Sequence, residues 1–393
     1  MSDILETRRI PYFPAEIMDI IIDLLHTDKA TLSSCTLVSR SWLPRSRLHL
    51  FTRVQVFGFQ TQFQPFIELL TQANGGPRLD PPISTTIKRL RLDGRDDSVF
   101  SSPEPLTTSM LKMLLCNLPN LLDLDVRGVI LTWVAPGLSD TGDKVALPDL
   151  IHLNSLTLDA FTTASKDPSD FVSSLCFFSS IDVLRISSPL YMDIPEDPAA
   201  VAAHPSLLTT MPYFPSHLKI SSIAVCDGEC TPFILALLQK TASVETINNV
   251  DVVCRTRVHA DALGSFLDNV GARIQNVSVD IVMLFQAAST LVAYASRTVQ
   301  TVFLDILLDG SYVDLSRFNS VVQNMATEFI WLQSAIKQKS SRLCIRWNGL
   351  QRMVKRIEER VRFEEELCRL VQSHLSKLGA DGMLSFASDV EDL

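Results

Sequence analysis

A short segment of the form apolar-x-apolar recurs along most of the chain, and an amphipathic helical segment separates most occurrences from the next. The strand-like segments are Leu90-Arg91-Leu92, Leu122-Asp123-Leu124, Leu156-Thr157-Leu158, Leu184-Arg185-Ile186, Ile223-Ala224-Val225, the residues around Ile247, Val277-Ser278-Val279, Val302-Phe303-Leu304 and Leu343-Cys344-Ile345, and they start 24 to 41 residues apart. Helices are predicted at 110–118, 171–178, 233–239, 261–270, 284–294 and 318–336. This alternation predicts parallel strands joined by helical crossovers. One unit cannot cover its own apolar face, so neighbouring units must stack, and we predict an α/β domain over residues 54–348.

The C-terminal part has a different pattern. Apolar residues recur there at intervals of three and four, beginning with Leu350, Val354, Ile357 and Val361. This spacing predicts one long helix over 349–379 that closes the exposed end of the stacked units; a coiled coil is the alternative. Residues 380–393 end in acidic side chains and are expected to form a flexible tail.

The first helix predicted from the sequence has more apolar surface than one core needs. Pro14 suits the first turn of a helix, and the apolar side chains between Ile17 and Leu25 fill an arc of roughly 200°, whereas packing on one core takes about 100°. Asp28 is a good N-cap for a second short helix. Three short helices in about 40 residues bury too little surface to be stable alone, so this unit is expected to dock on another surface.

The residues that carry this pattern resemble an F-box over residues 10–53. They are Phe13-Pro14-x-Glu16-Ile17-x-x-x-Ile21-x-x-x-Leu25, Ala30-Thr31-Leu32 and Val38-Ser39-Arg40-Ser41-Trp42. Phe13 stands where the family usually has Leu, and Ser39 where it usually has Cys. The resemblance implies docking on the Skp-type adaptor of a cullin–RING ubiquitin ligase, through Phe13, Pro14, Ile17, Ile21, Leu32 and Val38. The alternative is that these side chains pack only against the following domain.

The run from Leu118 to Val126 resembles the long, degenerate leucine-rich repeats found behind F-boxes. The resemblance implies an irregular leucine-rich-repeat-like solenoid whose concave wall carries the residues between the apolar strand positions. Aspartates follow several predicted strands, and they are Asp93, Asp125, Asp159, Asp280 and Asp305. Stacked in register, they would form an acidic edge that attracts a basic substrate segment. The alternative is that each Asp ends its strand in a turn or caps the next helix.

The composition and the motifs reduce the number of protein classes to which the chain can belong. The net charge is −9, which disfavours a nucleic-acid-binding protein. The start shows no signal peptide, no apolar stretch is long and clean enough to span a membrane, and eight scattered cysteines are typical of reduced thiols in the cytoplasm or nucleus.

Sites for catalysis, cofactors or metals are not predicted. Cys226 and Cys230 have a spacing that zinc ligands can use, but no second pair follows at a suitable distance. Neither a Gly-rich phosphate-binding motif nor a nucleophile elbow occurs.

Together these features predict a non-catalytic substrate-recognition subunit of an SCF-type ubiquitin ligase. The alternatives are an F-box scaffold that acts outside a ligase and an enzyme on a (β/α)8 barrel, whose active site would use aspartates at strand ends. The short Leu-rich strands with one polar face argue against the barrel, because barrel strands are buried on both faces.

Overall fold

The structure is a computed structural model that describes residues 14–58, 63–75, 82–95, 104–132, 150–187, 193–195, 200–201, 203–210, 213–226, 229–253, 256–270, 274–280, 301–307, 342–348 and, with gaps at 367, 370 and 374, 365–387. The described elements form an α/β protein with a large parallel sheet. Two of the predicted helices, 284–294 and 318–336, lie outside the described residues.

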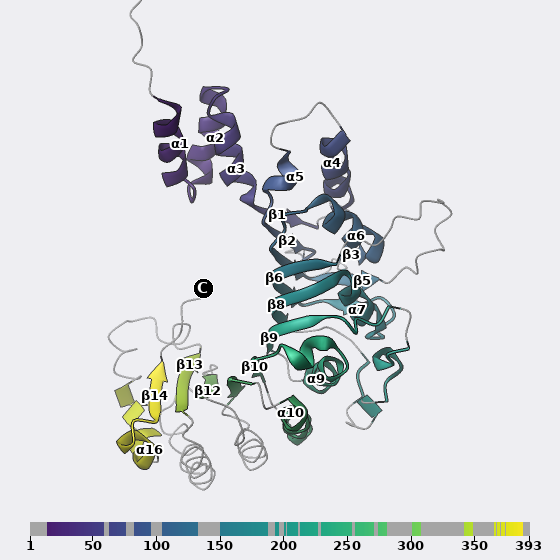
Figure 1. The fold of residues 1–393 in the computed structure, drawn as a ribbon, viewed down its shortest axis with the longest axis vertical. Coiled ribbons are helices and arrows are strands. Elements are labelled where there is room, and N and C mark those ends of the chain that lie inside the picture. Colours follow the sequence, from purple (N-terminus) through teal and green to yellow (C-terminus); the bar gives the residue numbers. More distant parts are fainter. Residues whose placement is uncertain are drawn as a thin grey trace, which may run out of the picture.

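Three short helices form the N-terminal unit: α1 (Ala15–Leu24), α2 (Lys29–Val38) and α3 (Leu43–Thr52). Pro14 directly precedes α1, and Asp28 caps α2 by accepting a hydrogen bond from the Thr31 backbone N–H at 3.0 Å. Pro44 stands in the first turn of α3, where its missing N–H has no cost. The unit lies at one end of the molecule, next to the first strand of the sheet (Figure 1).

Eleven of the described strands form the main sheet, and each pairs in parallel with the next one in the order β1-β2-β4-β6-β8-β9-β10-β11-β12-β13-β14. They are β1 (Arg53–Phe57), β2 (Arg89–Asp93), β4 (Asp123–Arg127), β6 (Ile151–Asp159), β8 (Phe178–Ser187), β9 (Lys219–Val225), β10 (Asn249–Val252), β11 (Asn276–Asp280), β12 (Thr301–Leu307), β13 (Arg342–Asn348) and β14 (Leu384–Ala387). Because β1 and β14 stand at opposite ends of this order, the described strands form an open row and not a closed barrel.

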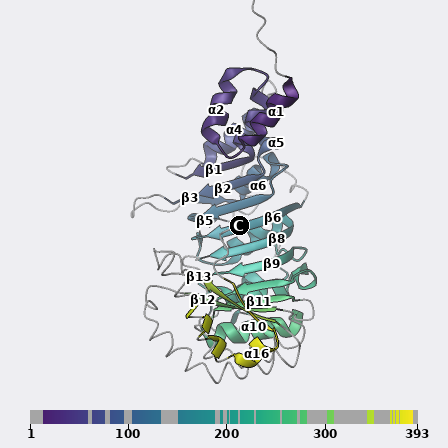
Figure 2. The ribbon, with the colours of Figure 1, turned by 90° about the vertical axis from the view of Figure 1, so that its left-hand side faces the viewer.

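One face of the sheet carries the core. The apolar residues of neighbouring strands stack in register, as in Leu90↔Leu124↔Leu156↔Leu184, and all of these are buried. Helices line this side of the sheet (Figure 1); they are α4 (Phe63–Gly75), α5 (Ile83–Thr86), α6 (Thr108–Asn117), α7 (Ser169–Ser174), α9 (Thr231–Gln239) and α10 (Arg257–Val270), with the short 3-10 helices η1 (Leu175–Phe177), η2 (Pro205–Leu207) and η3 (Ala242–Glu245). Figure 2 shows the opposite face of the sheet, which these helices leave open.

A second, three-stranded parallel sheet was not predicted. Its strands are β3 (Glu104–Thr107), β5 (Val129–Thr132) and β7 (Thr162–Thr163), in that order. Each is short, and β5 follows β4 after the single residue Gly128, so no separate turn signal marks it in the sequence.

Two expectations about strand positions need correction. The predicted strand Leu122-Asp123-Leu124 is displaced by two residues, because the structure pairs Leu90 with Leu124 and Leu92 with Val126. At the C-terminus, Leu343-Cys344-Ile345 is the last strand that the sequence predicts, but a further strand, β14, follows it and pairs with β13. The expected flexible tail over 380–393 therefore contributes a strand to the sheet.

The predicted helix over 349–379 lies partly outside the described residues. Where it is described, helical residues between Glu365 and Ser373 are followed by a bend at Leu375 and by a separate short helix, α16 (Ser376–Ala380). Val371 and Leu375 are fully buried and belong to the same core as the sheet, so this segment packs against the end of the α/β domain.

Candidate functional site

The first candidate site is an apolar surface on α1 and α2. In α1, Ile17, Ile20, Ile21 and Leu24 are 42 to 75% exposed, and at the end of α2 Leu37 is 87% and Val38 62% exposed. Only Ile22 of α1 is fully buried. The predicted surplus of apolar surface on the first helix is thereby confirmed. Exposed apolar side chains gathered on one small unit are typical of an interaction surface.

A polar contact fixes which way α1 faces. The Asp23 carboxylate accepts hydrogen bonds from Arg45 Nε at 2.6 Å, Arg45 Nη2 at 2.5 Å and His49 Nε2 at 2.7 Å, so α1 is held to α3 through its charged side. The hydrogen bonds from Arg45 and then His49 keep the pKa of Asp23 well below its usual range. With Asp23 and Ile22 directed at its own chain, α1 leaves the other apolar side chains open to solvent.

Loss of the Asp23 carboxylate is expected to loosen α1. In Asp23→Asn, amide hydrogen exchange measured on the full chain should become faster in α1 peptides, while Asp19→Asn, a change at an exposed position of the same helix, should leave it unchanged. The folded-state pKa is lowered, so the carboxylate stabilises above its unfolded pKa of about 4 and the effect fades as the pH falls below that value. Equal exchange in α1 for the wild type and Asp23→Asn at neutral pH would contradict this role.

The residues predicted to meet an adaptor are placed unevenly. Pro14, Ile17, Ile21 and Val38 are exposed, and Phe13 lies outside the described residues. Leu32 is fully buried, which places it inside the helical unit and not on the surface offered to a partner. Ile20, Leu24 and Leu37 are also exposed, but they are not among the residues predicted to meet the adaptor. The first two lie on the same apolar arc as Ile17 and Ile21, so the helical wheel carried the signal for them.

The second candidate site is the open face of the sheet shown in Figure 2. Three rows of side chains cross its first five strands. The rows are Arg53↔Arg89↔Asp123↔Ser155↔Val183, then Gln55↔Arg91↔Asp125↔Thr157↔Arg185, and Phe57↔Asp93↔Arg127↔Asp159↔Ser187. Asp93 and Asp159 thus share a row, but Arg127 stands between them. Asp125 lies in the neighbouring row because of the two-residue displacement of β4.

The aspartates of these rows do not form an acidic edge, because each one is bound to an arginine. The Asp93 carboxylate forms ion pairs with Arg91 Nη2 at 2.9 Å and with Arg95 Nε at 3.1 Å. Arg95 Nη1 also lies 3.6 Å from Asp159 Oδ2. Arg127 Nε lies 2.8 Å from Asp125, and Arg89 Nε 2.9 Å from Asp123. Asp280 and Asp305 pair in register on β11 and β12, but their side chains lie outside the described residues.

Asp93 is the centre of this network. Its side chain is buried, and burial alone would raise its pKa, but the hydrogen bonds from Arg95 and Arg91 outweigh burial and lower it. Gly128 makes room for Arg95: it has φ +57, and a Cβ at this position would come within 2.1 Å of Arg95 Cγ. A side chain at 128 would be strained and would displace Arg95 from Asp93 and Asp159.

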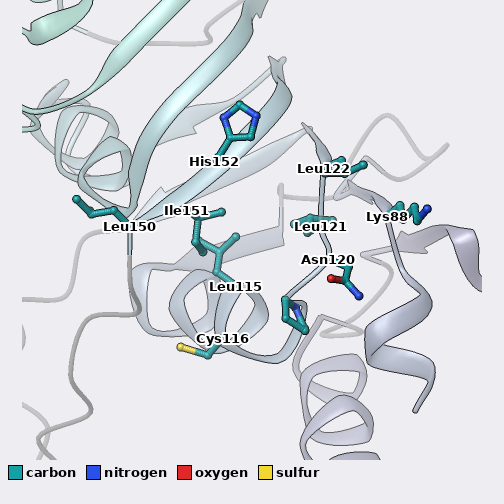
Figure 3. A pocket seen from close by; sticks show the side chains of 10 residues that line it. Lys88, Leu115, Cys116, Asn120, Leu121, Leu122, Leu150, Ile151 and His152 are labelled. Carbon is teal, nitrogen blue, oxygen red and sulfur yellow. The ribbon is translucent and has the colours of Figure 1, made fainter. Parts of the chain in front are cut away.

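The third candidate site is a hollow of about 710 Å³ between the starts of β4 and β6 and the end of α6 (Figure 3). Lys88, Cys116, Asn120 and His152 are among its lining residues. Asn120 donates to the Thr85 carbonyl at 2.7 Å, and His152 Nδ1 is 2.7 Å from Ser180 Oγ. Two of the polar groups are therefore engaged by the fold itself, and Cys116 and His152 are not hydrogen-bonded to each other.

No family model matches the chain, and no curated protein matches it. Within the described ranges, there is no group of three or more His, Cys, Asp or Glu side chains that could hold a metal ion. Of the helices that the structure describes, none has both the length and the apolar content to cross a membrane.

Proposed function

We propose that the chain is a substrate-recognition subunit of an SCF-type ubiquitin ligase, in which α1, α2 and α3 form an F-box that docks on a Skp-type adaptor. One observation carries the proposal: α1 directs Asp23 at Arg45 and His49 and leaves Ile17, Ile20, Ile21 and Leu24 in solvent. A helix that only packed on its own domain would direct those side chains inward. The exposed apolar side chains therefore favour a second protein as their partner.

In this proposal the remainder of the chain is an irregular leucine-rich-repeat-like solenoid that holds the substrate. The sequential order of the parallel strands, with helices on one side, supports it. The open face of the sheet would bind the substrate, and the function would be to raise the local concentration of substrate near a ubiquitin-charged enzyme carried by the same assembly. The chain itself would catalyse no reaction, and it would work in the cytoplasm or the nucleus.

The second candidate is an F-box scaffold that binds a Skp-type adaptor without a ligase, because the exposed face of α1 argues for the adaptor alone. Co-purification with adaptor and cullin separates the two. A complex with both proteins supports the ligase, and a complex with the adaptor that never contains a cullin supports the scaffold. Absence of any stable complex with a Skp-type adaptor would refute both. The barrel enzyme is disfavoured by the open, linear order of the eleven strands.

A further inference from the structure

The open face of the sheet is positively charged where it adjoins the helical unit, although the chain as a whole is acidic. Across β1, β2, β4, β6 and β8, the three rows together with Arg95 hold six arginines and four aspartates, and Asp182 of β8 is a fifth exposed aspartate, which leaves a surplus of one positive charge. The whole chain has a net charge of −9. The four aspartates of the rows are bound to arginines, and Asp182 lies 3.7 Å from His152, so the positive charge left for a partner is that of the remaining arginines.

Arg53 and Arg89 place two of these cations side by side. They are register partners on the adjacent strands β1 and β2, so their backbones are about 4.8 Å apart. Lys29 adds a third, because its Nζ donates to the Arg53 carbonyl at 3.1 Å. Arg89 has one carboxylate partner, Asp123, and Arg53 is in no ion pair with the described residues. Like charges directly opposite on neighbouring strands destabilise a sheet, and a bound anion would relieve the repulsion.

Arg185 forms a second positive point on the same face. It is exposed on β8, and none of the described residues forms an ion pair with it. It lies three strands from Arg89 and two residues further along the strand direction. The separation between the two positions is therefore about 16 Å, a distance that an extended chain spans in about five residues. Beyond Arg185 the described outward positions include the small or uncharged Ser222, Ala224 and Asn276. They also include the exposed carboxylate Asp251, which follows Ala224 in the row of Arg185. A segment can approach the sheet closely at β9, and its acidic residues must lie before β10.

We infer that this face binds an extended, acidic segment of the substrate protein, with aspartate or glutamate side chains about five residues apart on Arg53–Arg89 and on Arg185. Arginine pairs well with carboxylates, through two parallel hydrogen bonds. The inference rests on the proposed function, since it names the class of substrate for the solenoid. It differs from the basic segment that the sequence predicts, because Asp93, Asp125 and Asp159, three of the five aspartates expected to attract one, are paired with arginines. The side chains of the other two, Asp280 and Asp305, lie outside the described residues.

The test uses the full chain and a fluorescein-labelled peptide of Ser, Thr and Gly that carries two pairs of glutamates five residues apart. At about 50 mM salt, where screening is weak, it should bind at least ~10-fold more tightly than the same peptide with glutamine or with lysine. The double variant Arg53→Gln/Arg185→Gln removes two cations that have no ion pair to break and should lower the affinity ~10-fold. The control variant Arg40→Gln, which changes an exposed residue of the helical unit, should leave the affinity for the peptide unchanged.

Each other outcome overturns the inference. Equal binding of the glutamate and glutamine peptides, tighter binding of the lysine peptide, or an unchanged affinity in Arg53→Gln/Arg185→Gln would contradict it. A phosphoserine peptide that binds when the glutamate peptide does not would show that the face needs phosphate and not carboxylate. Binding of a Skp-type adaptor, measured on the same variants, tests the proposed function separately, because these substitutions leave Ile17 and Ile21 unchanged.

Discussion

Replacing Ile17 and Ile21 by aspartate is expected to abolish binding of a Skp-type adaptor while the chain stays folded. The two residues are four apart on α1, so they lie on one face, one above the other. Both are about half exposed, 43% and 42%. Each substitution is therefore expected to lower the free energy of unfolding of the free chain by only about 1 kcal/mol. In a complex the change removes apolar contact and buries two carboxylates without partners. The combined loss of binding free energy is at least about 5 kcal/mol, which corresponds to more than ~10³-fold in affinity.

Two matched variants make the result specific. Leu69→Asp changes an apolar residue of α4 that is similarly exposed, at 59%, but lies outside the helical unit, and it should leave adaptor binding intact. Ile22→Asp introduces the charge at the fully buried position of α1 and should unfold the helical unit as well as prevent binding. Affinity is measured by titration calorimetry and folding by hydrogen exchange. Retained adaptor binding in Ile17→Asp/Ile21→Asp, with α1 still protected, would refute the assignment.

The sequence predicts the main sheet well because its strands repeat one local pattern. Leu90, Leu156, Leu184 and Ile223 all begin predicted apolar-x-apolar segments and all lie in the stacked core. The displacement of β4 has a physical cause. In Leu122-Asp123-Leu124-Asp125-Val126 the alternation continues over five residues, so the local pattern fits two registers. Pairing with β2 and β6 selects the one that stacks Leu124 and Val126.

The charges on the open face could not be predicted from the pattern alone. The register of the strands and the residues of the neighbouring strand decide whether an aspartate is exposed to solvent or is paired with an arginine. Asp93 and Arg127 become neighbours only because β2 and β4 pair in the observed register, and Arg95 reaches Asp159 only because Gly128 leaves room for it. The exposed arc of α1 is the opposite case. It could be predicted, because it depends on the order of residues within one helix.

The strand β14 was missed for a related reason. Leu384-Ser385-Phe386-Ala387 is a single short alternation, and it lies next to an acidic end that indicates a tail. Its pairing with β13 satisfies an otherwise open edge, with Leu343 opposite Leu384 and Ile345 opposite Phe386. A contact of this kind, between a strand and one about 40 residues earlier, has no local signal in the sequence.

Asp93→Asn is expected to be the most destabilising single change on the open face. Asn keeps the shape but removes the charge that binds Arg91 and Arg95, and it leaves them only the longer ion pairs with Asp125 at 3.8 Å and Asp159 at 3.6 Å. The Asp93 side chain is buried but its arginine partners are 34% and 45% exposed, so the expected loss of stability is about 2 kcal/mol. It should appear as faster hydrogen exchange in β2 and β4. Asp182→Asn is the control, because that side chain is exposed and its ion-pair partner among the described residues, His152, is 3.7 Å away, so its effect should stay within about 0.5 kcal/mol.

The pH dependence gives an independent check on Asp93. Its pKa is lower in the folded chain than in the unfolded chain, so the carboxylate stabilises β2 above about pH 4, and the contribution is lost as the pH falls further. The wild type should therefore lose stability between about pH 5 and pH 2 more steeply than Asp93→Asn, which has no proton to gain at this position. Parallel curves for the two proteins would mean that the charge of Asp93 is not what holds Arg91 and Arg95 in place. The arginines would then be positioned by the packing of β2 and β4 alone, and Asp93→Asn would leave their arrangement unchanged.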